Sequence, residues 1–197
     1  MKCVEYLASS VLCVAFCSGA SSRIIEDFEG YTDTADLNTA VFGVQPNTTV
    51  TLDMIAGVGD SAGLIFEGAN GSDPFFSQFS LDTNNISLDG IDSVNFSARF
   101  VGGSGENLIT ELIDEFGGVV SRAEFGRTQL LPTDSFSELS VDTSFTSQAF
   151  HSIRFSFGGI DFGTTAVVID NISAIPAPGA GVLGITIVCA MVRRRRA

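Results

Sequence analysis

The sequence predicts an all-β fold, specifically a jelly-roll-like antiparallel β-sandwich, and three observations favour it. Short β-rich segments recur through the middle of the chain, several alternate apolar and polar residues, and Gly, Asp, Asn and Ser separate them. Alternation is typical of strands that bury one face. No sustained helical period occurs between Ser21 and Ile175. We therefore expect about ten strands, joined by tight turns and packed as two sheets.

The expected strands follow one another from the first residues of the middle region to its end. Alternation is clearest in 92–100, where Val94, Phe96, Ala98 and Phe100 share one face, and in 150–158. Only the segment 107–116 is compatible with a helix instead. The ten segments are 24–29, 48–55, 63–68, 75–81, 92–100, 107–116, 119–125, 135–142, 150–158 and 165–173.

The first 20 residues have the layout of a signal peptide. Lys2 precedes an apolar run from about Tyr6 to Cys17, and small residues follow it. This predicts an N-terminal signal helix that is cleaved near Ala20. A buried N-terminal helix and a lipoprotein site at Cys17 are the alternatives, although the bulky Phe16 disfavours the second.

Residues 176–197 have the layout of a second targeting segment. Pro176 and Pro178 hold the residues before them extended, which suits recognition by a protease. The run from Gly179 to Val192 is apolar or small apart from Thr186, which predicts a short transmembrane helix. A cluster of positive charges follows it and would keep the C-terminus in the cytoplasm; the cluster is Arg193, Arg194, Arg195 and Arg196.

The three parts of this tail together resemble the PEP-CTERM sorting signal of Gram-negative bacteria. The resemblance implies that an exosortase, a membrane transpeptidase, cuts at the proline motif and releases the protein to the cell surface or the extracellular polysaccharide. The motif here is Pro176-Ala177-Pro178, where the family usually has glutamate in the middle. A plain single-span anchor is the alternative, whereas a GPI signal does not end in four arginines.

The middle of the chain, residues 21–175, resembles jelly-roll modules of the galactose-binding and carbohydrate-binding type. It opens with "IIEDFEGYTDTADL" and closes with "IRFSFGGIDFGTTAVVIDNIS", and those modules commonly begin with an acidic Phe-Glu strand and end in a strand of this kind. The resemblance implies a structural calcium ion near the first and last strands. The carboxylates that could hold it are Glu26, Asp27, Glu29 and Asp170.

The charge of the middle region limits its partners. Five arginines stand against 22 acidic residues there, which gives a net charge of −17. Such a domain repels nucleic acid and anionic lipid. All four cysteines lie in the two terminal segments, so the domain is expected to depend on its hydrophobic core rather than on disulfides.

A sugar-binding surface usually presents aromatic rings, and the candidates here are few. The chain has no Trp, and Tyr31 is the only tyrosine beyond the signal peptide. Phe75 is adjacent to Phe76, so in a strand one of them faces outward. Tyr31 and Phe75 are therefore the predicted ligand-binding residues, and the other phenylalanines are expected to fill the core.

Catalytic chemistry has little support in the sequence. His151 is the only histidine, and the middle region has no Cys or Lys, so no nucleophile-base pair is evident. Glu111 and Asp114 would lie on opposite faces of a strand, which argues against a glycosidase. We expect a non-catalytic structural or adhesive protein of the cell surface or extracellular matrix. A carbohydrate-binding module is the alternative, and an envelope glycoside hydrolase is disfavoured.

Overall fold

The computed structural model describes residues 22–69, 77–103, 107–127, 135–158 and 164–178. Two units divide the chain: one comprises Met1–Gly19 and Gly181–Ala197, and the other is Ala20–Ala180. All the described residues belong to the second unit. Neither predicted terminal helix falls within them, and none of the helices in the described part is long and apolar enough to cross a membrane.

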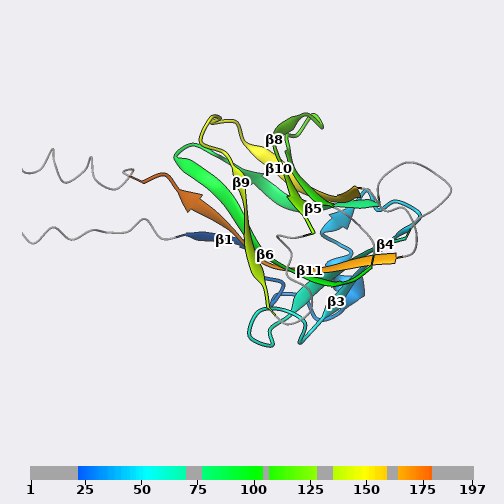
Figure 1. Cartoon of the computed structure of the whole chain (residues 1–197). Helices are drawn as coiled ribbons and strands as arrows, with labels where there is room; N and C mark the ends of the chain where they lie inside the picture. The colour runs from blue at the N-terminus through cyan, green and yellow to red at the C-terminus, as the bar shows by residue number, and fades with distance from the viewer. Residues whose placement is uncertain (1–21, 70–76, 104–106, 128–134, 159–163, 179–197) are drawn as a thin grey trace, which may run out of the picture. The chain divides into compact units, whose positions relative to one another are not determined.

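The described residues form two antiparallel sheets, and this confirms the predicted all-β sandwich. Sheet A has the strand order β3-β4-β11-β6-β9, with β1 paired to β11, and sheet B has the order β2-β5-β10-β7-β8. In Figure 1, β5, β8 and β10 lie in one layer and β3, β4, β6 and β11 in the other. Neighbouring strands in a sheet are mostly distant in sequence, so the sandwich is held by long-range pairing.

Successive strands alternate between the two sheets, except in the pairs β3–β4 and β7–β8, whose two strands are neighbours in one sheet. Sheet A is built from β1 (Arg23–Glu26), β3 (Thr48–Asp53), β4 (Gly63–Ala69), β6 (Ile91–Gly102), β9 (Ser137–Asp142) and β11 (Thr164–Pro176). Sheet B is built from β2 (Val41–Phe42), β5 (Gln78–Ile86), β7 (Asn107–Ile113), β8 (Val119–Gly126) and β10 (Phe150–Gly158). A single helical turn, α1 (Thr34–Leu37), lies between β1 and β2.

Phenylalanine rings from both sheets fill the core, as the alternation predicted. Phe66 of β4 stacks on Phe157 of β10 with ring centroids 4.2 Å apart. Phe155 of β10 contacts Phe96 of β6 edge to face at 5.4 Å. These pairs join sheet A to sheet B, and aromatic contacts in these geometries add to the free energy of burial.

Most predicted strands are confirmed, and the exceptions have local causes. The segment 107–116 contains a strand rather than a helix, and the strand ends at Ile113. The predicted strand 24–29 is wrong after Glu26. The Glu26 carboxylate accepts hydrogen bonds from the backbone N–H groups of Asp27 and Phe28. These bonds turn the chain, and Phe28 takes a φ of 60°, so the alternation expected for residues 26–29 does not occur.

The last strand continues into the predicted sorting motif. β11 ends at Pro176, which pairs with Ile91 of β6, and the N–H of Ala177 donates to the carbonyl of Gly90. The first two residues of the Pro-Ala-Pro motif are therefore attached to the sandwich. The predicted boundary at Ile175 lies inside a strand, two residues before this attachment ends.

Candidate functional site

The outer face of sheet B carries one continuous row of side chains, and we take this row as the candidate site. Strand register places one residue from each of the five strands in it, because Ser80 pairs with both Phe42 and Arg154, Arg154 pairs with Glu111, and Glu111 pairs with Arg122. The neighbours of these residues along each strand point into the core. We call this set the cross-strand row: Phe42, Ser80, Arg154, Glu111 and Arg122.

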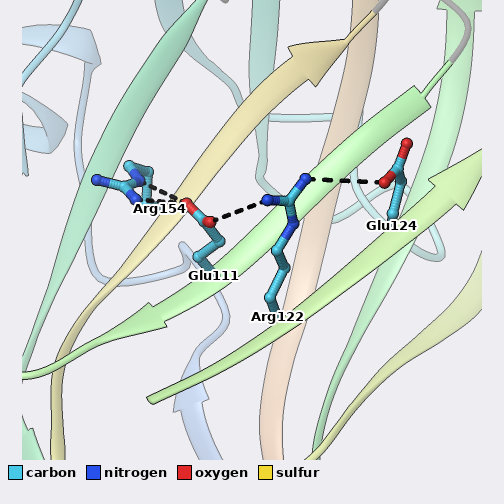
Figure 2. Close-up of polar contacts among 4 residues, drawn as sticks. All are labelled: Glu111, Arg122, Glu124 and Arg154. Atoms are coloured by element: carbon cyan, nitrogen blue, oxygen red, sulfur yellow. Dashed lines mark hydrogen bonds and ion pairs between the residues drawn. The ribbon is translucent and has the colours of Figure 1, made fainter. Parts of the chain in front are cut away.

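Glu111 is the electrostatic centre of the cross-strand row (Figure 2). Its Oε2 accepts hydrogen bonds from Nε of Arg154, at 2.8 Å, and from Nη2 of the same side chain. Its Oε1 lies 3.8 Å from Nη1 of Arg122. Each carboxylate oxygen therefore faces a different guanidinium. Charge-assisted bonds of this kind fix the orientation of the planar groups that take part.

Arg122 extends the charged group to a second carboxylate on the same strand. Its Nη2 lies 3.7 Å from Oε2 of Glu124. Both ion pairs of Arg122 are longer than hydrogen bonds, and its side chain is 52% exposed. By contrast, the side chain of Glu111 is 11% exposed. The row thus has an anchored, buried centre and an accessible guanidinium that can donate to a ligand.

The rest of this face combines exposed polar groups with a buried floor. Phe42 ends the row on the β2 side and is 48% exposed. Asp82 and His151 lie beside the row, and Nε2 of His151 is 3.9 Å from Oδ1 of Asp82. The short or apolar side chains between the charged ones are buried, namely Ser80, Ile109, Ile113, Ser152 and Ser156.

The outer face of sheet A differs from that of sheet B, because a loop covers part of it. The segment 54–62 between β3 and β4 crosses over Val168, which points outward yet is 1% exposed. Gly57 and Gly63 make this close approach possible: a Cβ on Gly57 would lie 2.7 Å from Oδ2 of Asp170, and one on Gly63 would lie 3.1 Å from Val168.

Asp170 holds this loop in place. Its fully buried carboxylate accepts hydrogen bonds from the N–H of Val58 at 2.7 Å, the hydroxyl of Ser61 at 3.1 Å and the N–H of Asn171 at 2.7 Å. Glu29 adds another bond, from the N–H of Ala62 at 2.7 Å. A bulge at Asn171, with φ 52°, shifts the register of β11 just after Asp170.

The structure thus brings two of the four predicted calcium ligands, Glu29 and Asp170, to the same loop. The oxygens of all four accept backbone or side-chain hydrogen bonds, including Asp27, whose Oδ1 accepts from the N–H of Glu29. Within the described part of the chain, no three His, Cys, Asp or Glu side chains gather closely enough to hold a metal ion. These oxygens serve the fold, and a calcium ion here stays a prediction.

Of the two predicted aromatic ligand residues, only Tyr31 is described. Its hydroxyl donates to Oε2 of Glu26 at 3.0 Å, and its ring packs against the core. Burial, followed by the nearby charge and hydrogen bond of Glu26, raises the pKa of Tyr31 well above its ordinary value. Ligand binding by Tyr31 stays a prediction, and Phe75 lies outside the described residues.

Sequence reasoning missed the cross-strand row, although one signal for it was present. Arg154 and Glu111 are charged residues at outward positions of strands whose inward positions are apolar apart from Thr110. Their opposite charges are compatible with pairing, but only the register of β10 against β7 places them side by side. Phe42 was not in any predicted strand.

Comparison with solved structures identifies the fold as the jelly-roll β-sandwich of carbohydrate-binding modules. The chain is similar to the family 11 module of the cellulosomal cellulase Lic26A-Cel5E of Clostridium thermocellum, with 14% identity, a TM-score of 0.55, and coverage of 81% of this chain and 97% of that chain. It is also similar to CBM28, a module specific for non-crystalline cellulose, with 12% identity, a TM-score of 0.51, and coverage of 71% and 90%.

Parts of larger enzymes share the same fold. An exo-β-agarase matches with 13% identity and a TM-score of 0.59, over 80% of this chain but 25% of that chain. The chain likewise spans 26% of an α-L-arabinofuranosidase that it matches. At these identities the likeness concerns the fold alone. No protein-family model matches the sequence, and no curated protein matches it either.

Proposed function

We propose that this protein is a non-catalytic carbohydrate-binding module, and that its ligand lies across the strands of sheet B along the cross-strand row. The observation that supports this most is that the match covers 97% of the chain of a solved carbohydrate-binding module, the family 11 module of a cellulase. The likeness therefore extends over that whole module. Binding is thereby assigned to a defined surface, where the sequence predicted only a general structural or adhesive role.

The chemistry of the row suits a polyhydroxylated ligand. A guanidinium has five N–H donors and a carboxylate accepts through two oxygens, so the row offers donors and acceptors to sugar hydroxyls. Phe42 offers an apolar ring at one end for a sugar face. The hydrogen bonds between Glu111 and Arg154 hold these groups before a ligand arrives, which lowers the entropy lost on binding.

The charge of the domain points to a neutral glycan. The net charge of −17 between Ser21 and Ile175 opposes the approach of an anionic polysaccharide. We expect uronate polymers such as alginate to bind weakly. We expect the ligand to be a neutral polysaccharide such as a β-glucan, xylan or agarose.

A non-catalytic role fits the placement of the acidic side chains. Glu111 and Glu124 share the outer face of sheet B, but Arg122 lies between them and pairs with both. Hydrolysis of a glycoside requires two carboxyl groups with room for the sugar between them, and here the Arg122 guanidinium occupies the space between the two carboxylates. We expect no hydrolysis of a polysaccharide that the protein binds.

For cellular placement we propose export and sorting by the two terminal segments. The signal-peptide layout of residues 1–20 and the PEP-CTERM-like layout of residues 176–197 support it. Mass spectrometry of the protein outside the cells tests the second segment. Loss of peptides from residues 179–196 is expected after exosortase cleavage, and their persistence would indicate a plain membrane anchor.

Native affinity electrophoresis of the full chain tests the binding proposal. Gels with mixed-linked β-glucan, xylan or agarose are compared with gels that contain alginate or no polysaccharide. We expect at least one neutral polysaccharide to retard migration and to release no reducing sugar on long incubation. Migration that is unchanged in every gel would refute the proposal, and sugar release would show that the protein is an enzyme.

A further inference from the structure

A second surface of the domain has the features of a binding site, and it lies away from the cross-strand row. A cleft of about 390 Å³ lies between the β5–β6 turn and the β9–β10 loop. The strands that these two segments connect are labelled in Figure 1. One wall comes from the turn before β6 and the other from the loop after β9. Its lining includes Asp89, Asp92, Ser144, Phe145, Thr146 and Ser147.

Backbone hydrogen bonds fix both walls of this end cleft. In the first wall, the N–H of Ile91 donates to the carbonyl of Leu88, and the N–H of Ala177 donates to the carbonyl of Gly90. In the second wall, the N–H of Thr146 donates to the carbonyl of Thr143. The hydroxyl of Thr143 joins the walls by donating to the carbonyl of Ile91 at 3.0 Å. The cleft is therefore formed before any ligand binds.

The end cleft also carries an exposed aromatic ring. Phe145 is 68% exposed although it belongs to a hydrogen-bonded loop. A planar apolar ring next to hydroxyl and carboxylate groups is the combination that a sugar ring needs, because its apolar face stacks while its hydroxyls form hydrogen bonds. None of the ten lining residues is basic, so the cleft disfavours an anionic ligand.

We propose that the end cleft is a second glycan-binding site, which takes a neutral sugar unit on the ring of Phe145 with Asp89 and Asp92 as hydrogen-bond acceptors. This inference rests on the proposed carbohydrate-binding function. A long polysaccharide that engages both the end cleft and the cross-strand row gains affinity from the second contact, because that contact is intramolecular. The protein would then bind polymers more tightly than short oligosaccharides.

Substitution of Phe145 tests the end cleft without endangering the fold, because the ring is mostly exposed. The probe is whichever neutral polysaccharide retards the full chain in affinity electrophoresis. We expect Phe145→Ala to weaken its affinity at least about five-fold, as truncation of an aromatic contact in a binding site typically does. Phe116→Ala is the matched control: Phe116 is 87% exposed on the neighbouring β7–β8 hairpin and does not line the cleft. We expect that control to bind like the unsubstituted chain.

The outcomes separate this inference from the proposed function. If Phe145→Ala and Phe116→Ala both bind like the unsubstituted chain while Arg122→Ala loses affinity, the end cleft is not a glycan site and the cross-strand row remains one. If Phe145→Ala alone loses affinity, the end cleft stands and the row does not. Equal losses in Phe145→Ala and Phe116→Ala would overturn the specific role of the cleft. A chain that binds no neutral polysaccharide overturns both proposals.

Discussion

Charged residues at outward strand positions have different partners on the outer faces of the two sheets. On sheet A, Asp170 points outward, and its carboxylate accepts hydrogen bonds from an N–H group and a hydroxyl of the β3–β4 loop. On sheet B, the charged residues of the cross-strand row bond to one another, and Arg122 stays half exposed. Outward polar residues therefore hold a loop in place on sheet A, whereas on sheet B they pair with one another and leave the Arg122 guanidinium exposed.

Removal of the sheet A anchor should produce the largest effect on stability. Asp170→Ala leaves the N–H groups of Val58 and Asn171 without the carboxylate that accepts from them, whereas the hydroxyl of Ser61 can still donate to the carbonyl of Val58. We expect the free energy of unfolding to fall by about 3 kcal/mol, measured by urea denaturation. Asp170→Asn keeps one acceptor oxygen and should lose less. A loss below about 1 kcal/mol in Asp170→Ala would contradict the anchoring role.

A substitution at a core-facing position of sheet B should change the free energy of unfolding by a smaller amount, and should increase it. Thr110 of β7 points into the core, and its hydroxyl has no hydrogen-bond partner among the described residues. Thr110→Val replaces the hydroxyl with a methyl group of similar size. We expect a gain of about 1 kcal/mol in the free energy of unfolding, read from the urea midpoint. Thr110→Ser, which keeps the hydroxyl and loses the methyl, should be destabilised instead.

The smallest effect on stability is expected at Asp142, the last residue of β9 in sheet A. Two hydrogen bonds from Ser144, one from its hydroxyl and one from its N–H, lower the pKa of Asp142. Since the folded pKa is lowered, this contribution to stability is present above the ordinary pKa and is lost as the pH falls through the folded value. Ser144→Ala should raise the pKa of Asp142 in an NMR titration. An unchanged pKa would show that the N–H alone is responsible.

The sequence predicted the strands well because alternation is a local property. Val94, Phe96 and Phe155 lie in the core as expected. The end of β1 could not be predicted from alternation, because the Glu26 carboxylate competes with the sheet for backbone N–H groups and turns the chain. The carboxylates that were predicted to bind calcium also accept hydrogen bonds from the chain, and the spacing of acids alone does not indicate which role each one has.

The candidate site was harder to predict than the strands, for a physical reason. The cross-strand row depends on the register of five strands, and register is set by tertiary pairing rather than by any one segment. The end cleft depends on two turns that are distant in the chain and joined by Thr143. Phe145 was visible in the sequence, but nothing in its own segment indicated that its ring would be exposed.

Affinity electrophoresis of two arginine variants tests the comparison between the faces most directly. Arg122→Ala removes the exposed guanidinium of the cross-strand row, and Arg23→Ala removes an exposed one from β1 of sheet A. Both change the net charge equally, and neither should alter stability by more than about 1 kcal/mol. We expect Arg122→Ala to lose affinity for the neutral polysaccharide about ten-fold, a change of about 1.4 kcal/mol in binding, while Arg23→Ala binds like the unsubstituted chain. Equal binding by the two variants would contradict the assignment of sheet B as the ligand face.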